Sequence, residues 1–335
     1  FYYDLPPELI AQTPAEPRDS SRLLIYDRLN KSSGHRYFTD LTEFLRKGDL
    51  LVINNTKVLP ARIRGVRPDT NGKIELLLLR REGIDRWQAL TKPGRNTLPG
   101  AKITFGSGLN AKVEDILEDG VRVVKFDCNG VFEDILREIG EMPLPPYIKR
   151  KLDDGERYNT VYSKVEGSAA APTAGLHFTE GLMKKIKNAG AGFAEILLHV
   201  GLGTFRPVKE EEITLHKMHS EHYEIDEKNA EKINSAVSER RRVIAVGTTT
   251  VRVLESVADE KGFVKPCRGE TEIFIYPPYK FKCVDALVTN FHLPESTLLM
   301  LVSAFCGREE ILRVYREAVE QKYRFFSFGD AMLLL

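Results

Sequence analysis

Histidine, arginine and asparagine side chains follow three apolar segments of this sequence, at points where strands would end. The segments are 196–206 (ILLHVGLGTFR), 243–252 (VIAVGTTTVR) and 288–294 (VTNFHLP). In open α/β sheets, ligands bind beyond the carboxyl ends of the strands, where such loops gather. The three loops together therefore predict one ligand site. The alternative is that the small residues only make tight turns.

The run Gly247-Thr248-Thr249-Thr250 stands between a predicted strand and a predicted helix. Its threonines could cap that helix, and free amide groups at a helix start can hold a carboxylate or a phosphate. The run is neither a GxGxxG motif nor a Walker loop, because no Gly-Lys-Ser/Thr follows it. Capping without any ligand is the alternative interpretation.

Small residues dominate the segment 169–178 (AAAPTAGLHF), which precedes a predicted helix. Small side chains let a backbone approach a flat ligand closely, and His177 would then face that ligand. The alternative is close packing against another element, with His177 as a buried, hydrogen-bonded histidine.

Metal chemistry is disfavoured by the spacing of the metal-binding residue types. His216, His219 and His222 are three apart, so on a helix the first two share a face, but no HExxH glutamate accompanies them. We expect a hydrogen-bonding or RNA-contacting role for His216 and His219. The four cysteines form no CxxC pair, which disfavours disulfides, zinc and iron–sulfur clusters and fits a reducing compartment.

The formal net charge of +1 means that any contact with nucleic acid must come from a local basic surface. The segment 322–326 (KYRFF) interleaves basic and aromatic residues, as single-strand binding platforms do. It is also typical of a strand with one buried face, which we favour. Arg240–Arg242 is either a solvated helix end or a patch that contacts phosphates.

The elements that must position these residues alternate between strand and helix after residue 151. Predicted strands at 193–200, 243–246, 272–276 and 284–289 alternate with helices beginning after Thr179, Glu227, Thr249 and Ser296. Between 61 and 126, short alternating runs separated by turn dipeptides such as Asn71-Gly72 indicate a small antiparallel barrel. We predict a layered α/β domain built from residues 1–57 and 151–335, with an inserted antiparallel β-barrel domain at 58–150.

No apolar run approaches the ~20 residues that a membrane span needs, and no signal peptide is visible in the sequence. We expect a cytoplasmic protein with no membrane partner that acts as a monomer.

Taken together, these segments resemble one family, the S-adenosylmethionine:tRNA ribosyltransferase-isomerases of queuosine biosynthesis. The likeness runs from end to end. It rests on 17–23 (PRDSSRL), 54–62 (NNTKVLPAR), 143–148 (PLPPYI), 167–178, 198–207, 216–219 (HKMH), 246–252, 289–294 and 325–332. The sequence departs from the family pattern in a shortened N-terminus and at His222, which lowers His222 as a candidate.

The resemblance implies that the ribosyl moiety of S-adenosylmethionine is transferred and isomerised onto 7-aminomethyl-7-deazaguanine at the tRNA wobble position. The products would be epoxyqueuosine-tRNA, adenine and methionine. S-adenosylmethionine would be consumed as a substrate, with no cofactor and no metal. The absence of a CxxxCxxC motif and of a methyltransferase-type glycine loop agrees with this chemistry.

A sulfonium makes the neighbouring ribose 5′ carbon acidic, so the reaction needs a general base, and the donor cation favours aromatic faces nearby. We expect proton transfers by His177, His199 or His292, with Asn290 and Thr204 orienting the substrate. Arg206, Arg252 or the helix start at Thr248–Thr250 would hold the methionine carboxylate. The remaining substrate-binding candidates are Phe178, Phe205, Phe291, Asp19 and Arg22.

Two rival functions follow from the same residues. A non-catalytic tRNA-binding protein would bind tRNA without affinity for S-adenosylmethionine, but it leaves the three strand-end loops unexplained. A metal-dependent hydrolase would use His216 and His219 as ligands and would need a metal for activity.

Overall fold

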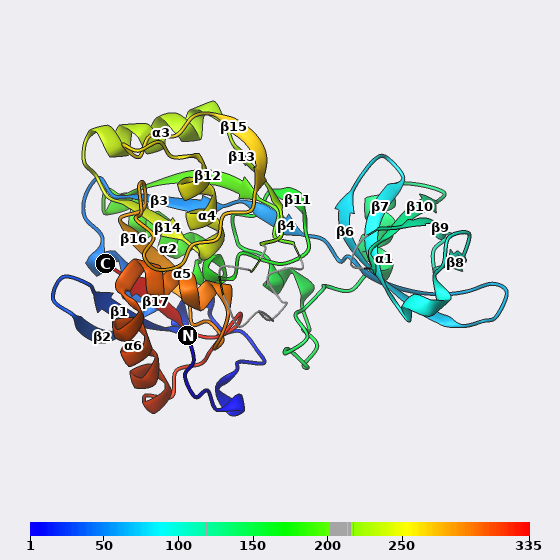
Figure 1. Cartoon of the computed structure of the whole chain (residues 1–335), viewed down its shortest axis with the longest axis horizontal. Coiled ribbons are helices and arrows are strands. Elements are labelled where there is room, and N and C mark those ends of the chain that lie inside the picture. The colour runs from blue at the N-terminus through cyan, green and yellow to red at the C-terminus, as the bar shows by residue number, and fades with distance from the viewer. Residues whose placement is uncertain (118–119, 202–212, 214–215, 217) are drawn as a thin grey trace.

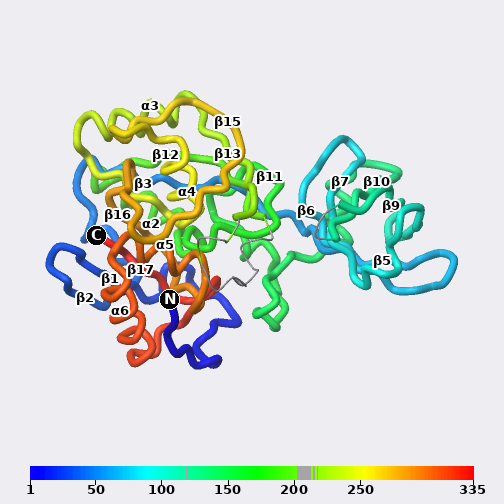
Figure 2. Tube along the Cα trace, in the orientation of Figure 1, coloured from blue at the N-terminus to red at the C-terminus, as the bar shows by residue number. Residues whose placement is uncertain are grey.

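The computed structural model describes residues 1–117, 120–201, 213, 216 and 218–335. A large layered α/β part and a smaller β-barrel lie side by side, joined by two stretches of chain (Figure 1). Both chain ends belong to the layered part (Figure 2).

A nine-stranded sheet forms the middle layer of the α/β part, in the order β15-β13-β12-β3-β14-β16-β17-β1-β2. Its strands are β1 (Arg22–Asp27), β2 (Ser32–Tyr37), β3 (Leu50–Asn54), β12 (Gly192–Leu198), β13 (Glu221–Ile225), β14 (Val243–Val246), β15 (Cys267–Thr271), β16 (Ala286–Asn290) and β17 (Ala331–Leu334). The four central strands β12, β3, β14 and β16 run parallel to one another. Every residue of β3, β14 and β16 is buried, as expected where helices cover both faces of a parallel sheet.

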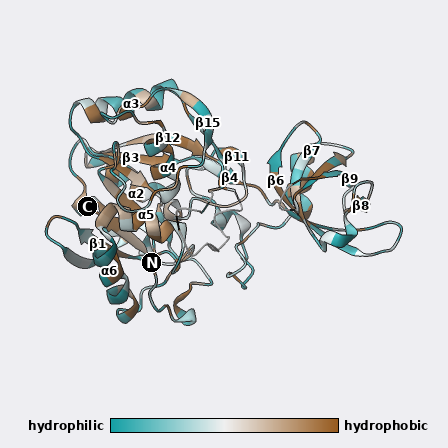
Figure 3. Ribbon diagram, viewed as in Figure 1, coloured by the Kyte–Doolittle hydropathy of each residue, from teal (hydrophilic) through white to brown (hydrophobic). Residues whose placement is uncertain are grey.

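Helices lie on both faces of the sheet, which is rich in hydrophobic residues (Figure 3). Apolar side chains of the sheet pack against these helices in two cores. One core joins the sheet to α3 (Glu227–Ser238), α4 (Thr248–Val257), α5 (Thr297–Cys306) and α6 (Arg308–Glu320). A second core, on the other face, joins it to α2 (Glu180–Asn188) and to the 3-10 helix Phe38–Phe44. Thr179 and Ser296 cap α2 and α5 through their hydroxyls, as the sequence predicts.

The barrel closes on itself in the order β10-β7-β6-β5-β8-β9, with every pair antiparallel. Its strands are β5 (Arg62–Val66), β6 (Lys73–Arg81), β7 (Arg86–Lys92), β8 (Lys102–Thr104), β9 (Asn110–Ile116) and β10 (Arg122–Asp127). Helix α1 (Phe132–Ile139) packs its apolar side chains into a separate barrel core that includes Trp87 and Phe126. A mixed α/β fold with a small antiparallel barrel is therefore confirmed.

The chain enters and leaves the barrel at one place. Arg62 and Glu141 form a two-way backbone bridge, with N···O distances of 3.1 and 2.8 Å. On the α/β side of this crossing, β4 (Thr56–Val58) pairs in parallel with β11 (Val165–Ser168). Such a side-by-side crossing is what an insertion requires. The domain boundaries at 57/58 and 150/151 stay predictions.

Two expected strands are wrong. The strand expected at 272–276 instead ends at Thr271, because the Arg252 guanidinium lies 3.4 Å from the carbonyl oxygens of both Thr271 and Ile273. The segment 322–326 is no strand either. Tyr323 and Phe325 are fully buried core residues, which rules them out as an exposed stacking platform.

The structure also bears on two alternatives for histidines and basic residues that the sequence leaves open. His222 lies in strand β13, so the three spaced histidines do not share a helix. Arg242 pairs with the buried carboxylate of Asp49 at 2.5 Å, and Arg241 donates to the Gly48 carbonyl at 2.7 Å. These two arginines therefore connect the segment after helix α3 to Gly48 and Asp49, and they do not form a free phosphate-binding patch.

Candidate active site

The carboxyl ends of the four parallel strands meet at one edge of the sheet, and the loops that follow β12, β14 and β16 help to enclose a small cavity. This cavity, of about 60 Å³, is walled by Tyr147, 170–174, Val200, 247–249, Thr289, Asn290, His292, Leu298, 326 and 327. The structure thus brings together residues from all three strand-end loops and from the small-residue segment. Ala170 to Ala174 let these backbones approach closely.

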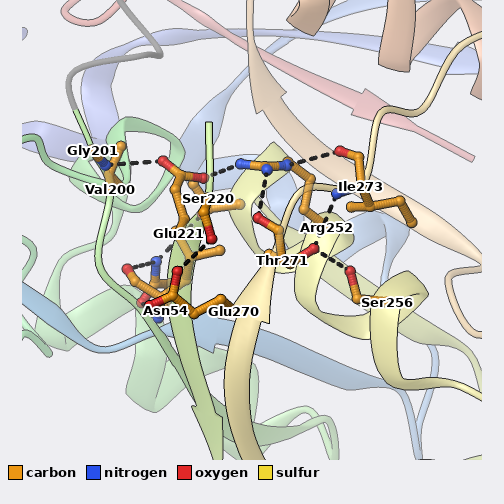
Figure 4. A network of polar contacts seen from close by, with 12 residues as sticks. Asn54, Val200, Gly201, Ser220, Glu221, Arg252, Ser256, Glu270, Thr271 and Ile273 are labelled. Atoms are coloured by element: carbon orange, nitrogen blue, oxygen red, sulfur yellow. Dashed lines mark hydrogen bonds and ion pairs between the residues drawn. The ribbon is translucent and has the colours of Figure 1, made fainter. Parts of the chain in front are cut away.

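Asn54, the last residue of β3, ties the loops to the sheet (Figure 4). Its side-chain amide accepts from the backbone N–H of Leu198 and donates to the carbonyl of the same residue, both at 3.0 Å. The amide nitrogen also lies 3.4 Å from the Thr249 hydroxyl. We did not single out Asn54 from the sequence, although a polar residue closing a wholly apolar strand was the available signal.

The start of helix α4 opens on the small cavity. Its N-cap is Gly247, at φ +89°, and no side chain caps the helix. The predicted capping by threonine is therefore wrong, because a glycine occupies the cap position. Thr248 and Thr249 line the cavity, whereas Thr250 is fully buried and donates its hydroxyl to the Val246 carbonyl at 2.8 Å. Thr250 is thus a structural residue.

A buried chain of hydrogen bonds runs from Thr173 to Ser21. The Thr173 hydroxyl donates to Asn290 Oδ1 at 3.0 Å, which leaves the Asn290 Nδ2 group to donate to His177 Nε2 at 3.0 Å. His177 must then carry its proton on Nδ1, 2.8 Å from Ser21 Oγ. Burial, assisted by nearby Arg324, lowers the His177 pKa to about 3, so the ring is neutral. Asn290 faces the cavity and His177 lies behind it.

His292 lines the small cavity but is held by its own loop. Its Nε2 lies 3.0 Å from the Thr289 hydroxyl, and its backbone N–H donates to the Tyr315 hydroxyl at 3.0 Å. Burial lowers the His292 pKa to about 3. The ring is therefore neutral at physiological pH.

His199 lines a second, larger cavity of about 550 Å³ between the strand ends and the barrel. Its Nδ1 lies 2.8 Å from the Thr56 hydroxyl, and its backbone N–H donates to the His222 carbonyl at 3.0 Å. Burial and the neighbouring His222 lower the His199 pKa to about 4. A side chain at Gly167, where φ is +143°, would come within 2.9 Å of the His199 ring.

The larger cavity has one wall from each part of the molecule. The sheet side provides His199, Gly201, Glu221 and His222, and the barrel side provides Arg80, Arg81, Trp87 and Gln88. Val200 lines both cavities, so they adjoin at this residue. A ligand could therefore extend from the strand ends towards the barrel.

Arg252 and Glu221 form a buried ion pair beside the larger cavity (Figure 4). Glu221 uses its other oxygen to accept from the Gly201 N–H at 2.9 Å. Because Arg252 is occupied by Glu221 and by two backbone carbonyls, the arrangement does not favour the expected binding of a methionine carboxylate. Its place in the structure is to fix the loop that follows β12.

Comparison with known proteins identifies the family. The sequence pattern of the family described as "Queuosine biosynthesis protein" matches residues 1–334. The chain belongs to this queuosine biosynthesis family. Proteins named S-adenosylmethionine:tRNA ribosyltransferase-isomerase from Caldanaerobacter subterraneus subsp. tengcongensis and Acetivibrio thermocellus are 58% and 57% identical to it. Each alignment covers 100% of this chain and 98% of the relative.

A solved structure resembles this member of the queuosine biosynthesis family along its whole length. The crystal structure of S-adenosylmethionine tRNA ribosyltransferase from Thermotoga maritima is 40% identical and covers 99% of both chains, with a TM-score of 0.56. The mixed α/β architecture with a barrel agrees with this likeness.

Two of the three aromatic residues expected near the donor line neither cavity. Phe178 and Phe291 are fully buried in the two cores of the α/β part, because their rings pack against other aromatic rings. The aromatic walls of the small cavity are instead Tyr147 and Phe326, whose ring centroids are 4.1 Å apart. Sequence reasoning missed both as site residues, although the motifs around them were noted.

The remaining candidates do not line either cavity or lie outside the described residues. Asp19 accepts from the Thr179 hydroxyl at 2.9 Å, and the Arg22 guanidinium lies 3.7 Å from the centre of the Tyr323 ring. Thr204, Phe205 and Arg206 fall among the residues that the structure does not describe.

Within the described part of the chain, no group of three His, Cys, Asp or Glu residues could hold a metal ion. The His216 ring packs against Phe274 with a centroid distance of 5.4 Å. In the same part of the chain, no helix is long and apolar enough to cross a bilayer.

Proposed function

We propose that this chain is an S-adenosylmethionine:tRNA ribosyltransferase-isomerase. It transfers and isomerises the ribosyl moiety of S-adenosylmethionine onto 7-aminomethyl-7-deazaguanine at the tRNA wobble position, giving epoxyqueuosine-tRNA, adenine and methionine. Relatives with this printed name match the chain at 57–58% identity over its full length. Identity of this extent supports a shared reaction.

One observation of the structure carries the proposal. Loops from the ends of three parallel strands, β12, β14 and β16, and the small-residue segment meet at a single cavity, which adjoins a larger one at Val200. The carboxyl edge of an open α/β sheet is where such folds bind their ligands. Two adjoining cavities suit a reaction that brings together a small donor and a nucleotide of a large RNA.

The size of the cavities suggests how the donor lies. The small cavity, at about 60 Å³, is far smaller than the larger one at about 550 Å³, so we place only one end of S-adenosylmethionine in it. The uncapped start of α4 offers backbone N–H groups and a positive dipole end there. We place the methionine carboxylate at Thr248 and Thr249, in preference to Arg252. The nucleoside end then extends past Val200 into the larger cavity.

Proton abstraction from the 5′ carbon needs an unprotonated base. Among the three candidate histidines, His199 is the one that lines the larger cavity, and its lowered pKa keeps it neutral at physiological pH. We propose His199 as the base. Asn290, held at both ends of its amide by Thr173 and His177, would orient the substrate from the other side.

We further propose that the reaction needs no cofactor or metal and takes place in the cytoplasm, on tRNA, by a monomer. The four cysteines, none of them in a disulfide, suit a reducing compartment.

The test is to incubate the purified chain with S-adenosylmethionine and tRNA that carries 7-aminomethyl-7-deazaguanine. Free adenine should accumulate in proportion to modified tRNA, and a chelator should not stop it. Unmodified tRNA of the same sequence is the control. Binding of tRNA without any release of adenine would favour the non-catalytic alternative.

A further inference from the structure

An arginine from the barrel stands at the rim of the larger cavity, paired with a glutamate from the edge of the sheet. We propose that Arg80 is a contact for a backbone phosphate of the tRNA anticodon strand, and that Glu270 occupies this arginine until the RNA displaces it. The inference rests on the proposed function, because it takes the larger cavity as the entry of the acceptor nucleotide.

The local backbone aims Arg80 at the cavity. Strand β6 carries a register shift against β7 between Leu78 and Arg80. Successive residues of a regular strand point to opposite faces, yet Leu79 and Arg80 both line this cavity. Bulges of this kind often occur at barrel rims next to active sites, where they re-aim a side chain.

The ion pair between Arg80 and Glu270 is one in which another anion can replace the carboxylate. Arg80 Nη1 lies 3.0 Å from Glu270 Oε1, and the two side chains are 62% and 40% exposed. Exposed ion pairs of this kind contribute only about 0–1 kcal/mol, so a competing anion can replace the carboxylate at little cost. Glu270 would keep a partner after exchange, because it also accepts from the Ser220 hydroxyl (Figure 4).

The neighbouring Arg81 lines the same cavity, but each of its three guanidinium nitrogens already has a hydrogen-bond partner within the protein. Its guanidinium donates to the Glu133 carboxylate at 2.5 Å and to the carbonyls of Gly83 and Ile84 at 3.0 and 2.6 Å. For Arg80, Glu270 is the one partner among the residues that the structure describes. Of the two described arginines that line this cavity, Arg80 is therefore the one with guanidinium N–H groups available to bind a further anion.

The chemistry of the partner follows from where the two charges lie. A nucleotide whose base reaches His199 at the inner wall leaves its sugar and phosphate at the exposed rim, where Arg80 stands. A guanidinium can bind a phosphate through two parallel N–H donors, which gives the contact geometric specificity as well as energy. The sheet side of the rim carries acidic Glu270, so the barrel has to provide the cation.

Three single variants test the exchange: Arg80→Gln, Glu270→Gln and the control Arg86→Gln. Arg86 is another exposed barrel arginine with a carboxylate partner, Glu114 at 2.9 Å, but it does not line the cavity. The measurement is tRNA affinity as a function of salt, together with the melting temperature and KM for tRNA. All three positions are exposed, so melting temperatures should stay close to wild type.

Arg80→Gln should weaken tRNA binding about tenfold and reduce the slope of log affinity against log salt by about 0.7–0.9, the loss of one phosphate contact. Glu270→Gln should bind tRNA about 1.4- to 5-fold more tightly, because the competing carboxylate is gone. Arg86→Gln should match the wild type. Exchange therefore predicts that Arg80→Gln and Glu270→Gln change tRNA affinity in opposite directions.

If the Arg80–Glu270 pair only held the barrel against the sheet, Arg80→Gln and Glu270→Gln would instead change tRNA affinity in the same direction. That result, or an Arg80→Gln slope equal to that of Arg86→Gln, overturns the inference. Failure of the proposed function is seen separately, as wild-type protein that binds tRNA but releases no adenine. The salt slopes still decide the role of Arg80 in that case.

Discussion

At the scale of single residues, three histidines at the strand ends, two of them buried and His199 half-buried, have three different surroundings. His177 lies behind Asn290, His292 is bonded to Thr289 within its own loop, and His199 lines the larger cavity. All three have lowered pKa values because burial disfavours the imidazolium. We propose that the base is a neutral ring that lines the larger cavity, and of the three only His199 does so.

Replacement of His199 by alanine should therefore lower kcat by about 10²–10⁴-fold, while tRNA affinity changes little. The control is His35→Ala, since His35 bonds to the Tyr323 hydroxyl far from either cavity wall. Single-turnover adenine release and tRNA binding, measured on the same preparations, separate the two effects. A His199→Ala protein that folds normally and turns over at the wild-type rate would show that the base lies elsewhere.

At the scale of elements, β13 holds residues 199–201, which follow β12, through two hydrogen bonds. The His222 carbonyl accepts from the His199 N–H, and the Glu221 carboxylate accepts from the Gly201 N–H. Helix α4 completes this arrangement, because Arg252 pairs with Glu221 where both are buried. The position of Val200 between the two cavities depends on this arrangement.

Removal of one member of this ion pair should be costly, because the other charge stays buried without its partner. We expect Arg252→Met to lower the free energy of unfolding by about 3–5 kcal/mol, measured by urea denaturation. Glu260→Gln, which breaks the exposed pair with Lys282, should cost less than about 1 kcal/mol.

The double variant Glu221→Met/Arg252→Met distinguishes stability from positioning. It should regain most of the lost stability, since no buried charge is left unpaired. Turnover should remain low, because the Gly201 N–H has lost the Glu221 carboxylate. Full recovery of both stability and turnover would mean that this arrangement does not position the site.

At the scale of the whole molecule, the candidate active site lies where two separately packed parts meet. The barrel has its own core, and the sheet has a core on each face. The larger cavity takes one wall from each part. The shape of this cavity therefore depends on where the barrel lies.

Buried neutral histidines should make the stability of the whole chain fall in mild acid. His177 and His292 have folded pKa values of about 3, against an ordinary value of 6.5 in the unfolded chain. The unfolded state then binds more protons between pH 6.5 and 3, so stability falls as pH drops below 6.5. At pH 5.5 each group should remove about 1.4 kcal/mol.

The check is urea denaturation of the wild type and of His292→Gln at pH 7.5 and 5.5. The variant should lose about 1.4 kcal/mol less than the wild type between the two pH values, whatever its stability at pH 7.5. An identical loss in both proteins would mean that His292 titrates normally in the folded state.

The sequence by itself determined the fold class and the neighbourhood of the site. Apolar runs that alternate with amphipathic segments specify the layered α/β part, and turn dipeptides at short intervals specify the barrel. Loops of small and polar residues after apolar strands were enough to predict a common ligand edge, because parallel strands end at the same side of a sheet. These are local signals that need no knowledge of distant partners.

The tertiary structure alone decided which of these residues face a cavity and which bond to or pack against other residues of the protein. Arg252 meets Glu221 across 31 residues of sequence, and His177 meets Ser21 across 156. Phe178 and Phe291 turned out to be core residues, while Tyr147 and Phe326 line the small cavity. Side-chain direction and long-range pairing depend on how elements pack against one another, and a local pattern of residue types carries no information about that packing.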